Sequence, residues 1–270
     1  MYTIPPAFSE FISPTCNRAR FIQDYLKAGG IDSAVMSLEG KNHIYVKFPK
    51  TQYNPMFRIK TVIAHYDRIG IGANDNSAAV FCLMEWALRQ AQGPQTSAVI
   101  PAHNIRLIFT DGEELGAAGV AEQGAFPLAQ TFRKLGITND DIYVFDCMGR
   151  GDVPILGAAK LPSNVSTRFL TDYSKLEDRT KQILKSVSNG KWFTLTISYS
   201  DNAIFIANGL PAVVITMLPS AEVTQVLNKQ IPPTWQYLHT PNDNLDSLTP
   251  EAFVIFSKII NSLAAQKSVL

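Results

Sequence analysis

The sequence is poor in the features that mark disulfide-bonded, membrane-spanning or nucleic-acid-binding proteins. Its 270 residues include three cysteines, an odd number without a CxxC spacing, so we expect reduced thiols rather than a disulfide framework. No apolar run approaches the roughly eighteen residues of a transmembrane helix, and the first residues lack a basic stretch followed by an apolar one. The formal net charge of +1 gives no electrostatic reason to expect nucleic acid or an anionic membrane as a partner. A cytoplasmic location is therefore expected.

The chain does have the apolar content of a globular protein, 46% of its residues, and it alternates strand patterns with helix patterns. These patterns predict strands at 34–38, 43–48, 59–64, 105–109, 142–145, 153–156, 195–197 and 212–217, and helices at 18–28, 77–90, 118–135, 165–187, 202–207 and 250–264. Residues 221–236 carry no pattern that assigns them. The alternation predicts an α/β fold, in which one domain over residues 1–270 places a mixed, mostly parallel twisted sheet between helices.

The stretch that organises the chain is the acidic turn after the strand predicted at 105–109. Asp111, Glu113 and Glu114 lie within four residues there. Like charges so close together cost energy unless they share a cation or a proton, although a solvated acidic turn is the simpler interpretation. Sites in open α/β sheets form beyond the carboxyl ends of the strands. Metal ligands at the other strand ends would therefore favour a cation site over a solvated turn.

Those strand ends supply further ligand types. His65 and Asp67 follow the strand at 59–64, Asp146 follows the strand at 142–145, and Asp75 lies in a Gly- and Asn-rich turn. His239 comes late, in a polar segment. Imidazole and carboxylate groups without thiolates are typical of a catalytic zinc site, or of a site for a related divalent ion.

Some of these residues also have a structural interpretation. If the strand stays regular, His65 and Asp67 share a face and the carboxylate can orient the imidazole, but the two could also be unrelated. Asp75 could be a helix N-cap. Asp146 emerges from the core, where an uncompensated charge favours a metal or a salt bridge. We expect Cys147 to be a buried structural thiol.

Taken in order, these motifs resemble the M28 family of zinc aminopeptidases. The resemblance extends over nearly the whole chain, because the order and the approximate spacing of the motifs both match. No single motif is specific for this family, whereas the full series in this order is a strong signal for it. The series consists of His65-Tyr66-Asp67, Gly72-Ala73-Asn74-Asp75-Asn76, Asp111-Gly112-Glu113-Glu114-Leu115-Gly116, Asp146 and His239-Thr240-Pro241-Asn242-Asp243.

The resemblance implies the zinc-dependent exopeptidase fold (phosphorylase/hydrolase-like) and a hydrolase that releases N-terminal amino acids from peptides. It implies two zinc ions, although other divalent metals would accept the same ligands. Glu113 would be the general base, and Asp67 would orient His65. By the same resemblance, Asp75 bridges both ions, His65 and Asp146 complete one site, and Glu114 and His239 complete the other.

The sequence departs from the family pattern in two places. The loop between His65 and Asp75 is shorter than in well-known family members, so one wall of the cleft is expected to be smaller. The stretch Ser200-Asp201-Asn202 has asparagine where the family has histidine, so a substrate contact by that side chain is in doubt. Tyr199 and Asp201 are candidates for holding the amino group of a substrate.

Two other functions compete with the aminopeptidase. Glutaminyl cyclases share the fold and much of the ligand series, but they resemble one another in having tryptophan where this chain has Leu238. The stretch Leu115-Gly116-Ala117-Ala118-Gly119 also follows the peptidase pattern better. A non-catalytic binding protein would have no need to keep buried acids together. The remaining histidines, His43 in the opening hairpin and His103 in a loop far from these strand ends, are expected to be structural or surface residues.

Overall fold

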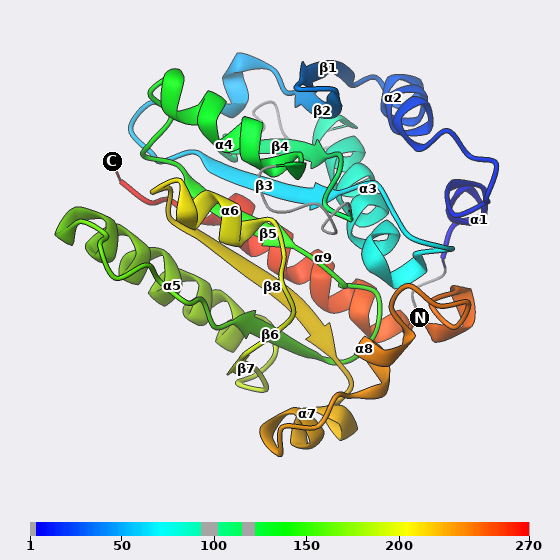
Figure 1. The fold of residues 1–270 in the computed structure, drawn as a ribbon. Coiled ribbons are helices and arrows are strands. Elements are labelled where there is room, and N and C mark those ends of the chain that lie inside the picture. Colours follow the sequence, from blue (N-terminus) through cyan, green and yellow to red (C-terminus); the bar gives the residue numbers. More distant parts are fainter. Residues whose placement is uncertain (1–3, 93–101, 115–121, 270) are drawn as a thin grey trace.

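The computed structural model describes residues 4–92, 102–114 and 122–269, and its centre is one mixed sheet (Figure 1). The strands follow the order β1-β2-β4-β3-β5-β8-β6-β7. Neighbours from β4 through β3 and β5 to β8 run parallel, whereas β1–β2, β2–β4 and β6–β8 are antiparallel. The bounds are β1 Asp32–Leu38, β2 Lys41–Lys47, β3 Lys60–His65, β4 Ile105–Thr110, β5 Asp141–Phe145, β6 Val153–Gly157, β7 Phe193–Leu195 and β8 Ala212–Leu218.

Helices cover both faces of this sheet, as Figure 1 shows. On one face α9 packs against both α3 and α5, and on the other α4 packs against α6, which lies on β5 and β8. The helices are α1 Pro6–Phe11, α2 Arg18–Ala28, α3 Ala78–Gln92, α4 Ala125–Lys134, α5 Thr167–Val187, α6 Asn202–Ala207, α7 Ser220–Leu227, α8 Pro233–Tyr237 and α9 Pro250–Ala265.

The helices on both faces of the sheet explain why the central strands consist largely of continuous apolar runs. Every residue of β3, β5 and β8 is buried. Parallel strands with helices on both faces have no solvent side, so they need no polar alternation. The hairpin β1–β2 lies at one edge, where β1 alternates between intermediate and exposed residues. The predicted mixed, mostly parallel α/β sheet between helices is confirmed.

Element boundaries differ from the predictions mainly where proline and short helices are involved. The helix predicted at 118–135 begins at Ala125 in the structure, and Pro127 falls in its first turn, where its missing N–H costs nothing. Residues 118–121 lie outside the described residues. The unassigned stretch 221–236 overlaps α7 and α8, two helices that are too short for periodicity to reveal.

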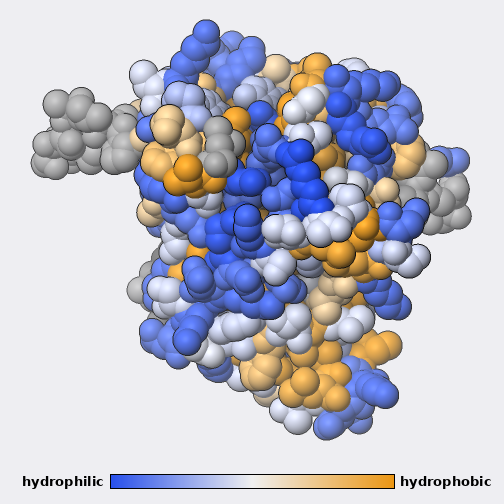
Figure 2. Space-filling model, turned by 90° about the vertical axis from the view of Figure 1, so that its left-hand side faces the viewer, coloured by the Kyte–Doolittle hydropathy of each residue, from blue (hydrophilic) through white to orange (hydrophobic). Residues whose placement is uncertain are grey.

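No helix of residues 4–92, 102–114 and 122–269 combines the length and the apolar character that crossing a membrane requires. An apolar region does show on the surface at the foot of the molecule in Figure 2, at the height of α7 in Figure 1. Leu227 and Ile231, at the end of α7 and just after it, are among the exposed large apolar side chains.

Candidate metal centre

The register of the sheet brings the acidic turn and the first histidine to the same edge. His65 is the last residue of β3 and pairs with Thr110, the last residue of β4. Asp146 follows β5, the other neighbour of β3. Side chains that are far apart in the sequence therefore leave three adjacent parallel strands at one end of the sheet.

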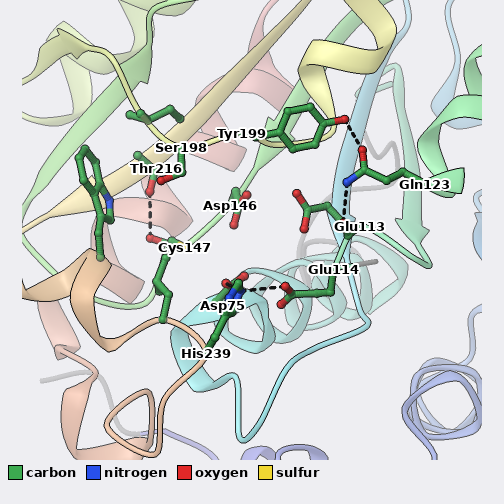
Figure 3. Close-up of a pocket in the computed structure, with 13 residues that line it drawn as sticks. Asp75, Glu113, Glu114, Gln123, Asp146, Cys147, Ser198, Tyr199, Thr216 and His239 are labelled. Atoms are coloured by element: carbon green, nitrogen blue, oxygen red, sulfur yellow. Dashed lines mark hydrogen bonds and ion pairs between the residues drawn. The ribbon is translucent and has the colours of Figure 1, made fainter. Parts of the chain in front are cut away.

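Two groups of ligand atoms meet there and share one aspartate. His65 Nε2 lies 3.2 Å from Asp75 Oδ1 and 3.6 Å from Asp146 Oδ1. His239 Nε2 lies 2.8 Å from Glu114 Oε2 and 3.3 Å from Asp75 Oδ2. Within each group the ligand atoms lie within 4.8 Å of one another. The structure thus brings all five predicted ligands together, and Figure 3 shows Asp75, Asp146, Glu114 and His239 around one cavity.

The donor set fits divalent cations. His65 Nε2, Glu114 Oε1 and Asp146 Oδ1 are buried and have no hydrogen-bond partner among the described residues. Leaving such atoms unpaired is costly, and a cation in each group would satisfy them. Burial alone would lower the pKa of His65, but the surrounding carboxylates raise it well above its usual value, and Asp75 raises the pKa of His239 to about 9. Both positions therefore favour positive charge.

The turn that carries Asp75 is held from two sides. The N–H groups of Asn74 and Asp75 donate to the two carboxylate oxygens of Asp243, at 2.6 and 3.1 Å. Asn76 donates from Nδ2 to the carbonyl oxygen of Phe145 at 2.8 Å and accepts from the Cys147 N–H at 3.2 Å. The Asp75–Asn76 peptide bond is cis. These hydrogen bonds tie the turn of Asp75 to the segment of Asp243 and to the end of β5.

Asp67 links the histidine to the acidic turn. Its Oδ1 lies 3.5 Å from His65 Nδ1, the nitrogen that faces away from the ligand groups. Its two oxygens also accept the N–H groups of Glu113 and Glu114, at 3.2 and 2.9 Å. Burial would raise the pKa of Asp67, but His65 and these N–H groups lower it, so the carboxylate stays ionised. A ligand histidine with such a partner has a fixed ring orientation.

The three acids of the turn take separate positions. Asp111 points to the hairpin, where it accepts the Asn42 N–H at 2.9 Å. Glu114 belongs to a ligand group, whereas Glu113 belongs to neither of them and lines the cavity. Burial, reinforced by nearby carboxylates, raises the pKa of Glu113 to about 9. The turn therefore offers one candidate metal ligand, Glu114, and one carboxyl group that belongs to neither ligand group, Glu113.

The cavity beside the clusters has a volume of about 420 Å³. Its apolar wall includes Ile197, Trp235 and Leu238. Of the two predicted substrate-binding residues, Tyr199 lines this cavity. Asp201 does not line it, because its side chain is buried and accepts the Thr110 hydroxyl at 2.7 Å.

Sequence reasoning missed several residues that complete the site. Asp243 was seen only as part of a motif, although it holds the turn of Asp75. Gln123 and Trp235 line the cavity without any signal in the sequence. Cys147 is buried, as expected, and its carbonyl oxygen accepts the Thr216 hydroxyl at 3.3 Å. The residues 115–119 that distinguish the peptidase pattern from the cyclase pattern lie outside the described residues.

The model of peptidase family M28 matches residues 44–264. The chain belongs to peptidase family M28. As a member of this family it is a peptidase-type hydrolase, and the matched residues include all five predicted ligands and Glu113. No curated protein matches the chain by sequence.

Solved structures resemble this M28 chain in fold at low identity. The LapA aminopeptidase of Legionella pneumophila is 16% identical, with a TM-score of 0.65 over 95% of this chain and 69% of that one. The glutaminyl cyclase of Bacteroides thetaiotaomicron is 16% identical, with a TM-score of 0.67 over 97% of this chain and 95% of that one. BSAP, a zinc aminopeptidase of Bacillus subtilis, is 16% identical, with a TM-score of 0.55 over 83% of this chain and 49% of that one. The shared fold extends to both aminopeptidases and cyclases.

Proposed function

We propose that this protein is a two-metal aminopeptidase that releases N-terminal amino acids from peptides. The observation that carries the proposal is the pair of ligand groups that share Asp75, with Glu113 uncommitted beside them. A single-metal site would need only one of these groups. The cluster of His65, Asp75 and Asp146 and the cluster of Asp75, Glu114 and His239 would each hold one divalent ion, with zinc preferred.

When bound, the two ions would activate a water molecule, polarise the scissile carbonyl and neutralise the charge that develops on its oxygen. The residues of the chain supply the proton transfers. Glu113 accepts a proton from the attacking water and then donates it to the nitrogen of the leaving amine. Burial and nearby carboxylates raise the pKa of the Glu113 carboxyl group to about 9 in the metal-free site, and two bound cations would lower this pKa, so that the carboxylate can accept the proton.

Other residues of the cavity would orient the peptide. Asp67 keeps the imidazole of His65 in place without contacting the substrate. Tyr199 would contact the amino-terminal end of the substrate, and the apolar wall with Trp235 and Leu238 would accept an uncharged side chain. For Asp201 we propose an indirect role, because its hydrogen bond to Thr110 places it behind the acidic turn.

The test is hydrolysis of a panel of amino-acid p-nitroanilides by the zinc-loaded protein, with the metal-free protein as the control. Release of nitroaniline that depends on the metal would support the proposal. A glutaminyl peptide in the same panel separates the rival function, because a cyclase would convert it to a pyroglutamyl product and would release no free amino acid. A metal-loaded protein that is inert toward every substrate would favour a binding protein of the same fold.

A further inference from the structure

Gln123 lies between the general base and the tyrosine of the cavity wall. Its side chain is 3% exposed and lines the cavity. Nε2 donates to the carbonyl oxygen of Glu113 at 2.7 Å, and Oε1 accepts the hydroxyl proton of Tyr199. Figure 3 shows both interactions in line, from the tyrosine through the amide to the backbone of Glu113. One amide therefore connects two residues of the site that are 86 positions apart in the chain.

The backbone next to Gln123 is packed tightly on the acidic turn. The Gly124 N–H donates to the carbonyl oxygen of Gly112 at 3.2 Å. A Cβ atom on Gly124 would lie 1.7 Å from the carbonyl oxygen of Asp111, so no other residue fits there without moving the turn. This contact fixes the start of the Gln123 side chain relative to the turn that carries Glu113.

The hydrogen bonds settle which way the amide points. A carbonyl oxygen can only accept, so the amide nitrogen of Gln123 must face Glu113 and the amide oxygen must face Tyr199. A tyrosine hydroxyl has one proton, and here that proton goes to Gln123. Burial, with Asp201 and Glu113 nearby, raises the pKa of Tyr199 above its usual value, so the proton stays in place. Only the lone pairs of the Tyr199 oxygen remain for a substrate.

We propose that Gln123 is a positioning residue that makes the Tyr199 hydroxyl a hydrogen-bond acceptor for an N–H group of the substrate. This inference rests on the proposed function and specifies how its substrate is recognised. It excludes the opposite role, in which Tyr199 donates to the carbonyl oxygen that becomes negative in the transition state. The N–H group is either the free amino terminus or the amide of the scissile bond, the two donors nearest the reacting carbon of a peptide.

Tyr199→Phe tests the direction of this hydrogen bond, because it removes the hydroxyl of a partly exposed ring and leaves the core intact. An acceptor contacts the substrate in the ground state and the transition state alike. We therefore expect KM for leucine p-nitroanilide to rise about 3- to 10-fold, with kcat within about 2-fold of wild type. A fall in kcat of about 10-fold or more at unchanged KM would show a donor to the oxyanion and would overturn the proposal.

Gln123→Met tests the positioning role, because it keeps the length of the side chain and removes both polar atoms. We expect the same rise in KM as for Tyr199→Phe, and no further rise in the double variant, since both changes remove one interaction. If the rise in KM of the double variant equals the product of the two single rises, Gln123 and Tyr199 act independently, and the positioning role is overturned. Gln230→Met, at an exposed position, is the matched control. If Gln123→Met does not fold, Tyr199→Phe still decides the direction.

A second substrate shows which N–H group of the substrate donates to Tyr199. Leucine p-nitrophenyl ester keeps the free amino terminus but lacks the N–H of the scissile amide. A rise in KM for Tyr199→Phe with both substrates identifies the amino terminus, and a rise with the anilide alone identifies the amide. Equal KM values for wild type and variant with both substrates would refute the inference.

Binding of L-leucine keeps the test independent of turnover. In calorimetry on the zinc-loaded protein, leucine affinity should fall about 3- to 10-fold in Tyr199→Phe if the amino terminus is the donor. Leucinamide has both kinds of N–H and is itself a substrate, so its affinity is compared with and without Tyr199→Phe in a Glu113→Gln background, where turnover is slow; it should fall by the same factor with either donor. An inert wild type would refute the proposed function, whereas unchanged affinity of the variant for leucinamide would refute the inference alone.

Discussion

Asp243→Asn should weaken both the fold and the metal site, because this side chain holds the turn that presents the shared aspartate. Asp243 is 1% exposed, and its two oxygens accept the N–H groups of Asn74 and Asp75. Asparagine keeps one oxygen and turns an amide nitrogen toward the other N–H. One hydrogen bond to a charged acceptor is then lost and a donor is left buried, which costs about 2–3 kcal/mol of the free energy of unfolding.

For a chain of this size that loss lowers Tm by about 4–10 °C. The melting measurement uses the metal-free protein, because a bound metal would itself stabilise the fold and mask the effect. Calorimetric titration with zinc should then show affinity lower by about 10- to 100-fold, as for other residues that orient a ligand. Asp246→Asn, at an exposed position in the same segment, is the control. Unchanged Tm and unchanged zinc affinity in Asp243→Asn would refute the role of Asp243.

Three further predictions concern the base, a buried histidine and the wall of the cavity. Glu113→Gln should lower kcat by about 100-fold or more with zinc binding retained, measured by anilide hydrolysis and metal analysis. Burial lowers the pKa of His103 from 6.5 to about 4 in the folded protein. Between pH 6.5 and pH 4 the imidazole therefore binds a proton in the unfolded chain but not in the folded one, so the free energy of unfolding should fall as the pH drops. Chemical denaturation should show that His103→Asn removes about 1.4 kcal/mol per pH unit from this slope. Arg150 contacts the buried Glu222 at 3.1 Å and the Thr234 hydroxyl of α8 at 2.9 Å, so Arg150→Met should lower Tm by about 6–12 °C and raise KM.

The sequence predicts which side chains lie together at the sheet edge most directly where a candidate ligand ends a strand. His65 and Asp146 follow long apolar runs, and parallel strands necessarily bring their carboxyl ends to one edge of the sheet. Asp75 and His239 lie on turns, whose path no periodicity predicts. They were found because the family resemblance joined them to the strand ends.

The residues that support the ligands could not be predicted in the same way. Asp243 and Gln123 bind backbone N–H and carbonyl groups, which every residue has, so their partners leave no mark in the sequence. The cavity wall with Trp235 comes from α8, a helix of five residues that begins at a proline. A helix that short owes its existence to packing rather than to its own pattern.

The most direct test of the central claim is the number of zinc ions that the metal-free protein binds. Calorimetric titration should give two ions per chain, one ion in Asp146→Ala, and little binding in Asp75→Ala, because Asp75 serves both groups. Metal analysis of the dialysed proteins should give the same ratios. A wild-type protein that binds one ion or none, with Asp146→Ala indistinguishable from it, would contradict the two-metal site.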